Sequence, residues 1–160
     1  MSKTLVVYYS RSGNARKEGQ AIAAALGADS KEIVDATNRS GLLGFMRSGF
    51  EGMTKRMARI RQAQKDPAAH DLVVVGTPVW AGSLSSPVRA FPAQNGGRFR
   101  KVALFLTQGG ERADPVFDEM RSRGGHPCHP GGAVVGRRLP SAGSCVRQRP
   151  EVAAAQVHLP

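Results

Sequence analysis

The sequence of 160 residues lacks any continuous apolar run of the roughly 18 residues that a membrane-spanning helix needs. The apolar stretch within MSKTLVVYYSRSG is short, and no cleavage site of a signal peptide follows it. Cysteine is also scarce, and because nothing indicates export, we expect Cys128 and Cys145 to be free thiols. These absences predict a cytoplasmic protein with no membrane span, and the length is typical of one hydrophobic core.

Acidic and aromatic residues are few as well. Aromatic residues make up 6% of the chain, and 12 Asp and Glu oppose 23 Lys and Arg, which gives a net charge of +11. A basic chain can bind nucleic acid, an anionic cofactor or an acidic partner. Nucleic-acid surfaces usually add interleaved aromatic residues or a known helix motif, so we expect no nucleic-acid binding here. The sequence contains no evident acid–base dyad or triad, which leaves the catalytic residues unknown.

Short apolar runs alternate with longer segments of helical spacing. The runs TLVVYY, DLVVVG and KVALFLT are typical of buried strands, and KEIVDA is a weaker candidate. The segment after the first run has helical spacing and ends at Gly27, residues 40–65 favour a helix, and SLSSPVRAF and ADPVFDEMR are suited to helix starts. This order predicts an α/β fold with a parallel sheet and helices on both faces. The four expected strands are residues 4–9, 31–36, 71–76 and 101–107.

Ligands of such sheets bind outside the carboxyl ends of the strands, which draws attention to the loops SRSGNA, TPVWAG and TQGG. In the first loop Ser10 and Ser12 offer hydroxyl groups, and Gly13 permits a turn of positive φ. The free amides of the next helix would then favour a phosphate group. The alternative is a simple helix cap, in which Ser12 or Asn14 satisfies those amides. The loop is neither a P-loop nor a GxGxxG motif.

Taken together, the three loops resemble those of the flavodoxin family and its FMN-binding relatives. The resemblance covers residues 3 to about 120 and is strongest in YYSRSGNA and DLVVVGTPVWAGSLSSPVRAF. It implies a flavodoxin-like three-layer sandwich, strand order 2-1-3-4-(5), and bound FMN. By this resemblance the phosphate would contact Ser10, Arg11, Ser12, Gly13, Asn14 and Ala15, and the ring would contact Thr77, Pro78, Val79, Trp80, Ala81 and Gly82, with Thr107, Gln108, Gly109 and Gly110 as a second ring segment.

This chain departs from the family at two places in the expected site. Ala15 stands where the family usually has Thr, so one hydroxyl contact to the phosphate is missing. Arg11, Arg16 and Lys17 either compensate for it or form a solvated face. Trp80, the only tryptophan, is expected against the flavin, with packing in the core as the alternative.

No aromatic residue lies between Leu106 and Phe117, where carrier flavodoxins often place a second ring over the flavin. One flavin face would therefore be open to a nicotinamide or a quinone. The resemblance thus favours an oxidoreductase that uses NAD(P)H to reduce quinone-like acceptors, or else an electron carrier. The alternative is a protein of this fold that binds no flavin. The sequence leaves open the redox partners and whether copies of the chain form a homo-oligomer.

Residues 121–160 do not continue the pattern. They contain no Lys, Asp, Phe, Tyr or Trp, although both cysteines fall there. We interpret residues 1–120 as the FMN-binding domain and residues 121–160 as an atypical tail, and hypothesise a shifted reading frame near 121–124. On this interpretation the fifth strand and last helix are doubtful, with GAVVG a weak candidate strand, and KVALFLT becomes an unprotected sheet edge. The cramped HPCHP segment is not expected to bind a metal.

Overall fold

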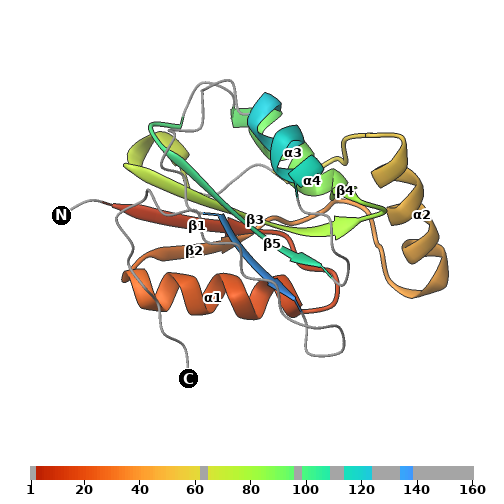
Figure 1. Cartoon of the computed structure of the whole chain (residues 1–160), viewed down its shortest axis with the longest axis horizontal. Coiled ribbons are helices and arrows are strands. Elements are labelled where there is room, and N and C mark those ends of the chain that lie inside the picture. The colour runs from red at the N-terminus through yellow and green to blue at the C-terminus, as the bar shows by residue number, and fades with distance from the viewer. Residues whose placement is uncertain (1–2, 62–64, 96–98, 109–113, 124–133, 139–160) are drawn as a thin grey trace.

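Strands and helices alternate along the chain in the computed structural model, which describes residues 3–61, 65–95, 99–108, 114–123 and 134–138 (Figure 1). The elements in chain order are β1 (Thr4–Tyr8), α1 (Asn14–Leu26), β2 (Asp29–Glu32), α2 (Gly41–Met53), the 3₁₀ turn η1 (Pro67–Ala69), β3 (Leu72–Trp80), β4 (Ser83–Leu84), α3 (Ser86–Asn95), β5 (Val102–Gln108), α4 (Asp114–Arg123) and β6 (Val134–Arg138).

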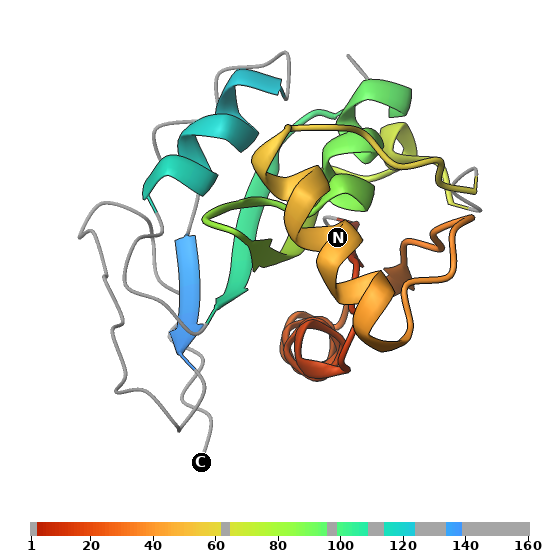
Figure 2. The same cartoon turned by 90° about the vertical axis from the view of Figure 1, so that its right-hand side faces the viewer.

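The main sheet consists of parallel strands in the order β2-β1-β3-β5-β6, and the short β4 pairs antiparallel with β3. Helix α1 covers one face of this sheet, whereas α3 and α4 cover the other (Figure 1). This arrangement confirms the predicted parallel sheet with helices on both faces. Because β4 is not one of the parallel strands, β5 and β6 are the fourth and fifth of them, and the strand order is the expected 2-1-3-4-(5). Helix α2 belongs to neither layer and lies at the end of the molecule where β3 ends (Figures 1 and 2).

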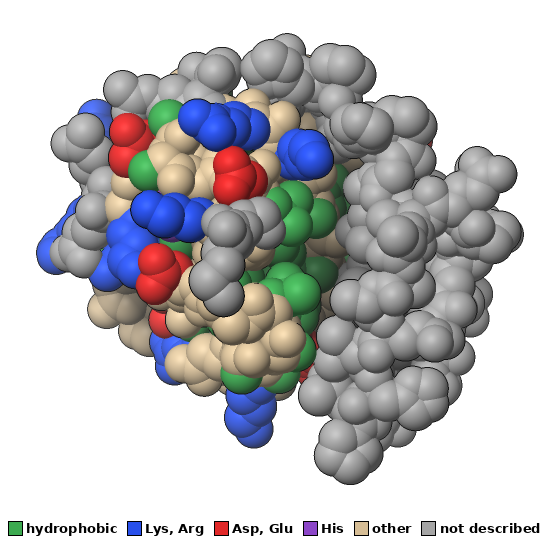
Figure 3. Space-filling view, turned by 90° about the vertical axis from the view of Figure 1, so that its left-hand side faces the viewer, with side chains coloured by type: hydrophobic (Ala, Val, Ile, Leu, Met, Phe, Trp, Pro, Cys, Tyr) green, Lys and Arg blue, Asp and Glu red, His purple; other side chains and the backbone are tan. Residues whose placement is uncertain are grey.

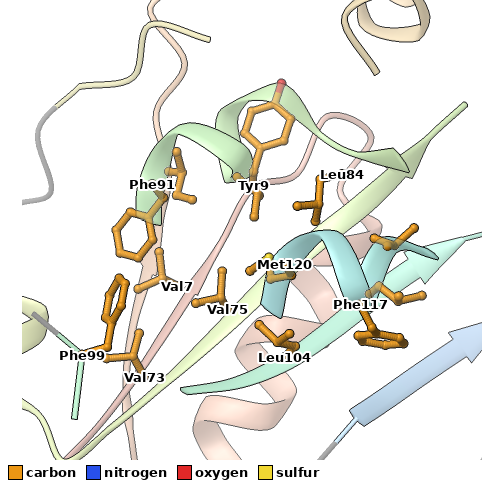
Figure 4. Packing of buried hydrophobic residues seen from close by; sticks show 14 of the residues in the cluster. Val7, Tyr9, Val73, Val75, Leu84, Phe91, Phe99, Leu104, Phe117 and Met120 are labelled. Atoms are coloured by element: carbon orange, nitrogen blue, oxygen red, sulfur yellow. The ribbon is translucent and has the colours of Figure 1, made fainter. Parts of the chain in front are cut away.

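Alternate side chains of the central strands supply the two halves of the core. Leu5 and Val7 of β1 pack with residues of α3 and α4, whereas Val6 and Tyr8 pack with Ala23 of α1. Figure 4 shows the larger half, in which side chains from β1, β3 and β5 meet those of the two covering helices. Burial on both faces explains why the strands are continuous apolar runs rather than alternating ones.

Helix α1 ends where the sequence predicts. Gly27 has φ of 57° and donates its amide hydrogen to the carbonyl oxygens of Ala23 and Ala24. A residue without Cβ adopts this left-handed conformation at little cost, and the turn satisfies carbonyls that the helix end leaves open.

The prediction for β2 is wrong in its position. The strand spans Asp29–Glu32 instead of 31–36. The chain leaves the sheet after Glu32 because its next residues pair with a distant segment, with Ala36 donating to the Arg59 carbonyl at 2.8 Å and Arg61 donating to the Val34 carbonyl at 2.9 Å. This pairing joins residues far apart in the sequence, and no local pattern indicates it.

The predicted sheet edge at KVALFLT is also wrong. Strand β6 pairs in parallel with β5, from Leu104 opposite Val134 to Gln108 opposite Arg138. The fifth strand, which the sequence left doubtful, is therefore present and overlaps the weak candidate GAVVG. A last helix, the cysteines and the HPCHP segment would lie outside the described residues. The reading-frame hypothesis and the proposed boundary near residue 120 stay predictions.

A buried arginine holds the helices to the end of the sheet. Arg89 of α3 is fully buried, and its Nε donates to Glu119 Oε1 of α4 at 2.7 Å. Its Nη2 donates to the Leu84 carbonyl of β4 at 2.9 Å. Its Nη1 donates to the carbonyls of Glu51 in α2 at 3.2 Å and of Arg56 at 2.7 Å. One rigid guanidinium thus joins α2, α3, α4 and β4.

We expect the stability of the protein to fall steeply between pH 5 and pH 2. Burial alone would raise the pKa of Glu51 and of Glu119, but hydrogen bonds from Ser86 and Arg47 to Glu51, and from Arg89 and Ser83 to Glu119, lower both to about 2. The unfolded chain binds protons at these carboxylates near pH 4.5, so their stabilising contribution is complete above that pH and is lost as the pH falls toward 2. Urea unfolding at a series of pH values measures it.

The variant Glu119→Gln tests the assignment, because it removes the titrating partner of Arg89. It should lose about 3 kcal/mol of unfolding free energy at pH 7 and show a flatter pH dependence. Asp118→Asn is the control, because Asp118 is the exposed neighbour of Glu119 on α4. An Asp118→Asn variant that loses as much stability as Glu119→Gln would contradict this account.

Candidate functional site

The chain segment after β1 opens toward the start of α1 without a side-chain cap. Gly13 precedes the helix with φ of 91°, and its amide donates to Ser10 Oγ at 3.0 Å. Ser12 Oγ accepts from the side-chain amide of Asn14 at 3.3 Å, and no side chain caps the helix. The alternative prediction, in which Ser12 or Asn14 caps the helix, is therefore wrong. The amides of the first turn stay available to an anion.

Of the three basic residues that could compensate for the missing hydroxyl, Arg16 pairs with an acid and Arg11 contacts an aromatic ring. Arg16 forms a two-pronged ion pair with Glu32 of β2 at 2.8 and 2.9 Å, and hydrogen bonding to that carboxylate raises the pKa of Arg16. Arg11 lies over the Phe45 ring of α2, with its Cζ 5.1 Å from the ring centroid. Arg16 is thus engaged with Glu32, which leaves Arg11 and Lys17 for the compensating role. Ala15 is buried, so a methyl group occupies the position of the missing hydroxyl.

The second expected segment is the end of a strand rather than a loop. Strand β3 runs through to Trp80, and Ala81 and Gly82, with φ of 48° and 71°, turn the chain into β4. Thr77 braces this hairpin, because its Oγ1 lies 3.0 Å from Ser85 Oγ and accepts from the Ser85 amide at 3.3 Å. Residues 77–80 also pair with β5 and β4 within the sheet, so only Ala81 and Gly82 form the turn.

Trp80 packs into the core at this end of the sheet. Its side chain is among the buried residues, at 9% exposed, and its ring meets the ring of Tyr9 edge to face with centroids 5.6 Å apart. The guanidinium of Arg39 lies over the indole, with Cζ 5.2 Å from the ring centroid. The packing alternative thus describes Trp80 as it stands, and contact with a flavin stays a prediction. Burial also raises the pKa of Tyr9 to about 12, so this phenol stays neutral.

Arg39 is the residue of the site that sequence reasoning missed. It is 4% exposed, its Nε donates to Asp35, and its Nη2 donates to Glu51 Oε2 at 2.7 Å. Its Nη1 is buried and has no hydrogen-bond partner among the described residues. A buried donor without an acceptor is costly, and here it lies beside Trp80. No motif could have indicated it, because Tyr9, Arg39, Glu51 and Trp80 meet only in the fold.

The three predicted segments lie on adjacent strands. Tyr8 of β1 is opposite Gly76 of β3, and Pro78 of β3 is opposite Thr107 of β5. The carboxyl ends of these strands therefore meet at one edge, as expected for a ligand site of this fold. Of the last segment, Thr107 is buried, Gln108 ends β5, and Gly109 and Gly110 lie outside the described residues. Within the described ranges no group of three or more metal-ligating side chains occurs, and no helix is long and apolar enough to cross a membrane.

Comparison with solved structures finds the same architecture. A flavoprotein from Lactobacillus acidophilus, solved in complex with FMN, matches 85% of this chain and 91% of its own, at 22% identity and a TM-score of 0.69. The fold is flavodoxin-like. A protein described as a flavoprotein from Bacteroides uniformis matches 88% of this chain and 94% of its own, at 20% identity and a TM-score of 0.74. A WrbA-like flavodoxin from Agrobacterium tumefaciens matches 87% of this chain and 84% of its own, at 16% identity and a TM-score of 0.58. By sequence, neither a protein-family model nor a curated protein matches.

We predict that replacing Gly52 of α2 by alanine lowers the stability of the protein, whereas replacing Gly49 of the same helix raises it. A Cβ on Gly52 would lie 2.5 Å from the Trp80 carbonyl oxygen, whereas a Cβ on Gly49 meets nothing within 4 Å. Gly52→Ala should therefore lose about 1–3 kcal/mol of unfolding free energy, because backbone atoms must move. Gly49→Ala, the control in the same helix, should gain about 0.5–1 kcal/mol from helix propensity. Urea unfolding followed by Trp80 emission measures both, and equal effects would mean that α2 does not press on Trp80.

Proposed function

We propose that the chain binds FMN at the carboxyl edge of its sheet and acts as a redox flavoprotein. The uncapped start of α1 carries this proposal, because its free amides lie beside two serines in a segment whose first residues pair with β3 at Gly76. A phosphate is the anion that such a helix start commonly binds. The Lactobacillus acidophilus flavoprotein of the same fold holds FMN, which supports the choice of ligand.

In this proposal the phosphate is held by Ser10, Arg11, Ser12, Gly13, Asn14 and Ala15. The hairpin of residues 77–82 lies along the ring, together with the segment Thr107, Gln108, Gly109 and Gly110, of which β5 contains the first two residues. When bound, FMN supplies the transfer of electrons. The protein supplies orientation and electrostatics. The unpartnered Nη1 of Arg39 is a buried donor beside Trp80, and it suits an acceptor group of a ligand at this edge.

We further propose that the acceptors are quinone-like molecules and that NAD(P)H is the donor. The segment between Leu106 and Phe117 contains no aromatic residue that could stack on the second flavin face. An open face admits a nicotinamide or a quinone. The net charge of +11 also favours an anionic dinucleotide over the basic partners that acidic carriers use. One-electron transfer to a protein is the alternative within the same class.

A role without flavin is the second candidate, and the burial of Trp80 between Tyr9 and Arg39 favours it. The two candidates differ in a direct measurement. Because Trp80 is the only tryptophan, a bound flavin in contact with it should quench most of the indole emission. Emission that is unchanged at high FMN concentration supports the flavin-free role.

If the start of α1 holds the phosphate, FMN should bind much more tightly than riboflavin, which has the same ring and no phosphate. Ser12→Ala should weaken FMN binding by about 1–2 kcal/mol, that is about 5- to 30-fold, and leave riboflavin binding nearly unchanged. Calorimetric titration measures all four affinities. Ser30→Ala is the matched control, because Ser30 is an exposed serine of β2 away from the loop. Equal affinities for FMN and riboflavin would contradict the phosphate site.

The donor and acceptor are tested separately from FMN binding. The FMN-loaded protein should oxidise NADH or NADPH in the presence of a water-soluble quinone, and the rate should fall to the uncatalysed level in the protein without FMN. An FMN complex that accepts electrons from a chemical reductant, but not from either nicotinamide, would favour the carrier role over the reductase role.

A further inference from the structure

Helix α2 packs on the protein with its polar and small residues and turns its apolar residues outward. Gly44, Ser48, Glu51 and Gly52 are its buried residues. We define the α2 face as the exposed apolar residues of this helix and the next turn of chain, whose exposed fractions range from 54% at Phe50 to 83% at Leu43. The α2 face consists of Leu42, Leu43, Phe45, Met46, Phe50, Met53 and Met57. This pattern is the reverse of that of a helix that covers a core.

The outward direction of the α2 face is fixed by buried polar contacts. Glu51 points inward, where its Oε2 accepts from Arg39 at 2.7 Å and from the Ser86 hydroxyl at 2.5 Å. A Cβ on Gly44 would collide with the Arg39 backbone, and one on Gly52 would collide with that of Trp80. Rolling α2 to bury its apolar residues would remove Glu51 from Arg39 and from Ser86 and leave buried donors without this acceptor, which is destabilising. The exposure therefore belongs to the folded protein and is not relieved by a small rotation.

Basic residues flank the α2 face along the chain, and one of them, Arg47, forms an ion pair with Glu51 at 2.8 Å. Glu51 is the only acid between Ser40 and Arg61 and is turned inward, whereas five basic residues fall in that range. The Arg56 guanidinium lies over the Phe50 ring, with Cζ 5.5 Å from the centroid, and Arg11 lies over Phe45. Among the described residues neither of these arginines forms an ion pair. The five basic residues are Arg47, Lys55, Arg56, Arg59 and Arg61.

We propose that the α2 face docks on the surface of an anionic lipid bilayer, with α2 lying in the plane of the interface. A helix with outward Leu, Phe and Met side chains and flanking arginines binds such a surface through apolar burial and attraction to acidic headgroups. Helix α2 forms one end of the molecule, so nothing else in the described chain stands between the α2 face and a flat surface (Figures 1 and 2). Figure 3 views the opposite end, where acidic and basic side chains are mixed.

The charge around the α2 face favours an anionic bilayer over a second copy of the chain. Two α2 faces packed together would bring Lys55 and Arg56 of each copy close to those of the other, and the one acid of the segment, Glu51, is already engaged by Arg39 and Arg47. An anionic surface instead complements them. The interaction does not require FMN, but if the proposed function holds, docking would bring the flavin edge near apolar quinones dissolved in the bilayer.

The full chain without FMN is tested by sedimentation with vesicles of phosphatidylcholine alone or of a 3:1 mixture with phosphatidylglycerol. It should bind the anionic vesicles and not the neutral ones, and raising the salt concentration should release it. The variant Leu43→Gln/Phe50→Gln should bind at least about tenfold more weakly. Leu26→Gln, an exposed leucine at the end of α1, is the matched control and should bind as the wild type does.

A second variant, Lys55→Glu/Arg56→Glu, reverses the charge of two of the five basic residues, keeps every apolar side chain of the α2 face, and should also abolish binding. Circular dichroism confirms that each variant is folded. Binding to anionic vesicles that the α2 variants leave unchanged, or that Leu26→Gln weakens as much, would overturn the proposal. So would a dimer in analytical ultracentrifugation that Leu43→Gln/Phe50→Gln dissociates, in a chain that no vesicle binds. Because FMN is absent throughout, failure here is independent of the phosphate-site test.

Discussion

The guanidinium of Arg89 is the interaction on which the carboxyl edge of the sheet depends. It is fully buried, and it donates hydrogen bonds to β4, to the carboxylate of Glu119 and to the backbone at the end of α2. Burying a charge is unfavourable unless it is paired and hydrogen-bonded, so each of these partners must be in place for the domain to be stable. The hairpin after β3 is therefore held in one position, and the expected ring segment of the site is built on rigid structure.

A second buried arginine extends this constraint to Trp80. Arg39 contacts the indole and shares Glu51 with Ser86 of α3, so the loop after β2, helix α2 and helix α3 meet at one carboxylate. Polar clusters of this kind must be satisfied completely, because a partly satisfied one is worse than an apolar core. Only Arg39 Nη1 is left without a partner among the described residues. The exception falls beside the predicted cofactor edge, where an incoming acceptor would complete the cluster.

The sequence predicts the layers well and the contacts between them poorly. Apolar runs and the closing Gly27 identify the central strands and α1, because these are local patterns of burial and backbone conformation. The position of β2 is missed because residues 34–36 pair with residues 59–61. From the sequence the fifth strand is doubtful, with GAVVG a weak candidate, because the composition of residues 121–160 is atypical, yet β6 completes the sheet. For the site, the loop positions follow from topology, whereas the roles of Arg39 and Glu51 depend on side chains that are distant in the chain.

The buried contacts of Glu51 with Arg39 and Ser86 also determine which side of α2 is exposed. Glu51 is on the inward side of α2 because Arg39 and Ser86 bind it, and Leu42 and Met53, on the opposite side of the helix, are therefore turned outward. The outward apolar side is thus a geometric consequence of the polar cluster beside Trp80. A ligand that engaged Arg39 would act on the contact that orients α2, so we expect occupancy of the proposed site to influence the α2 face through this one carboxylate.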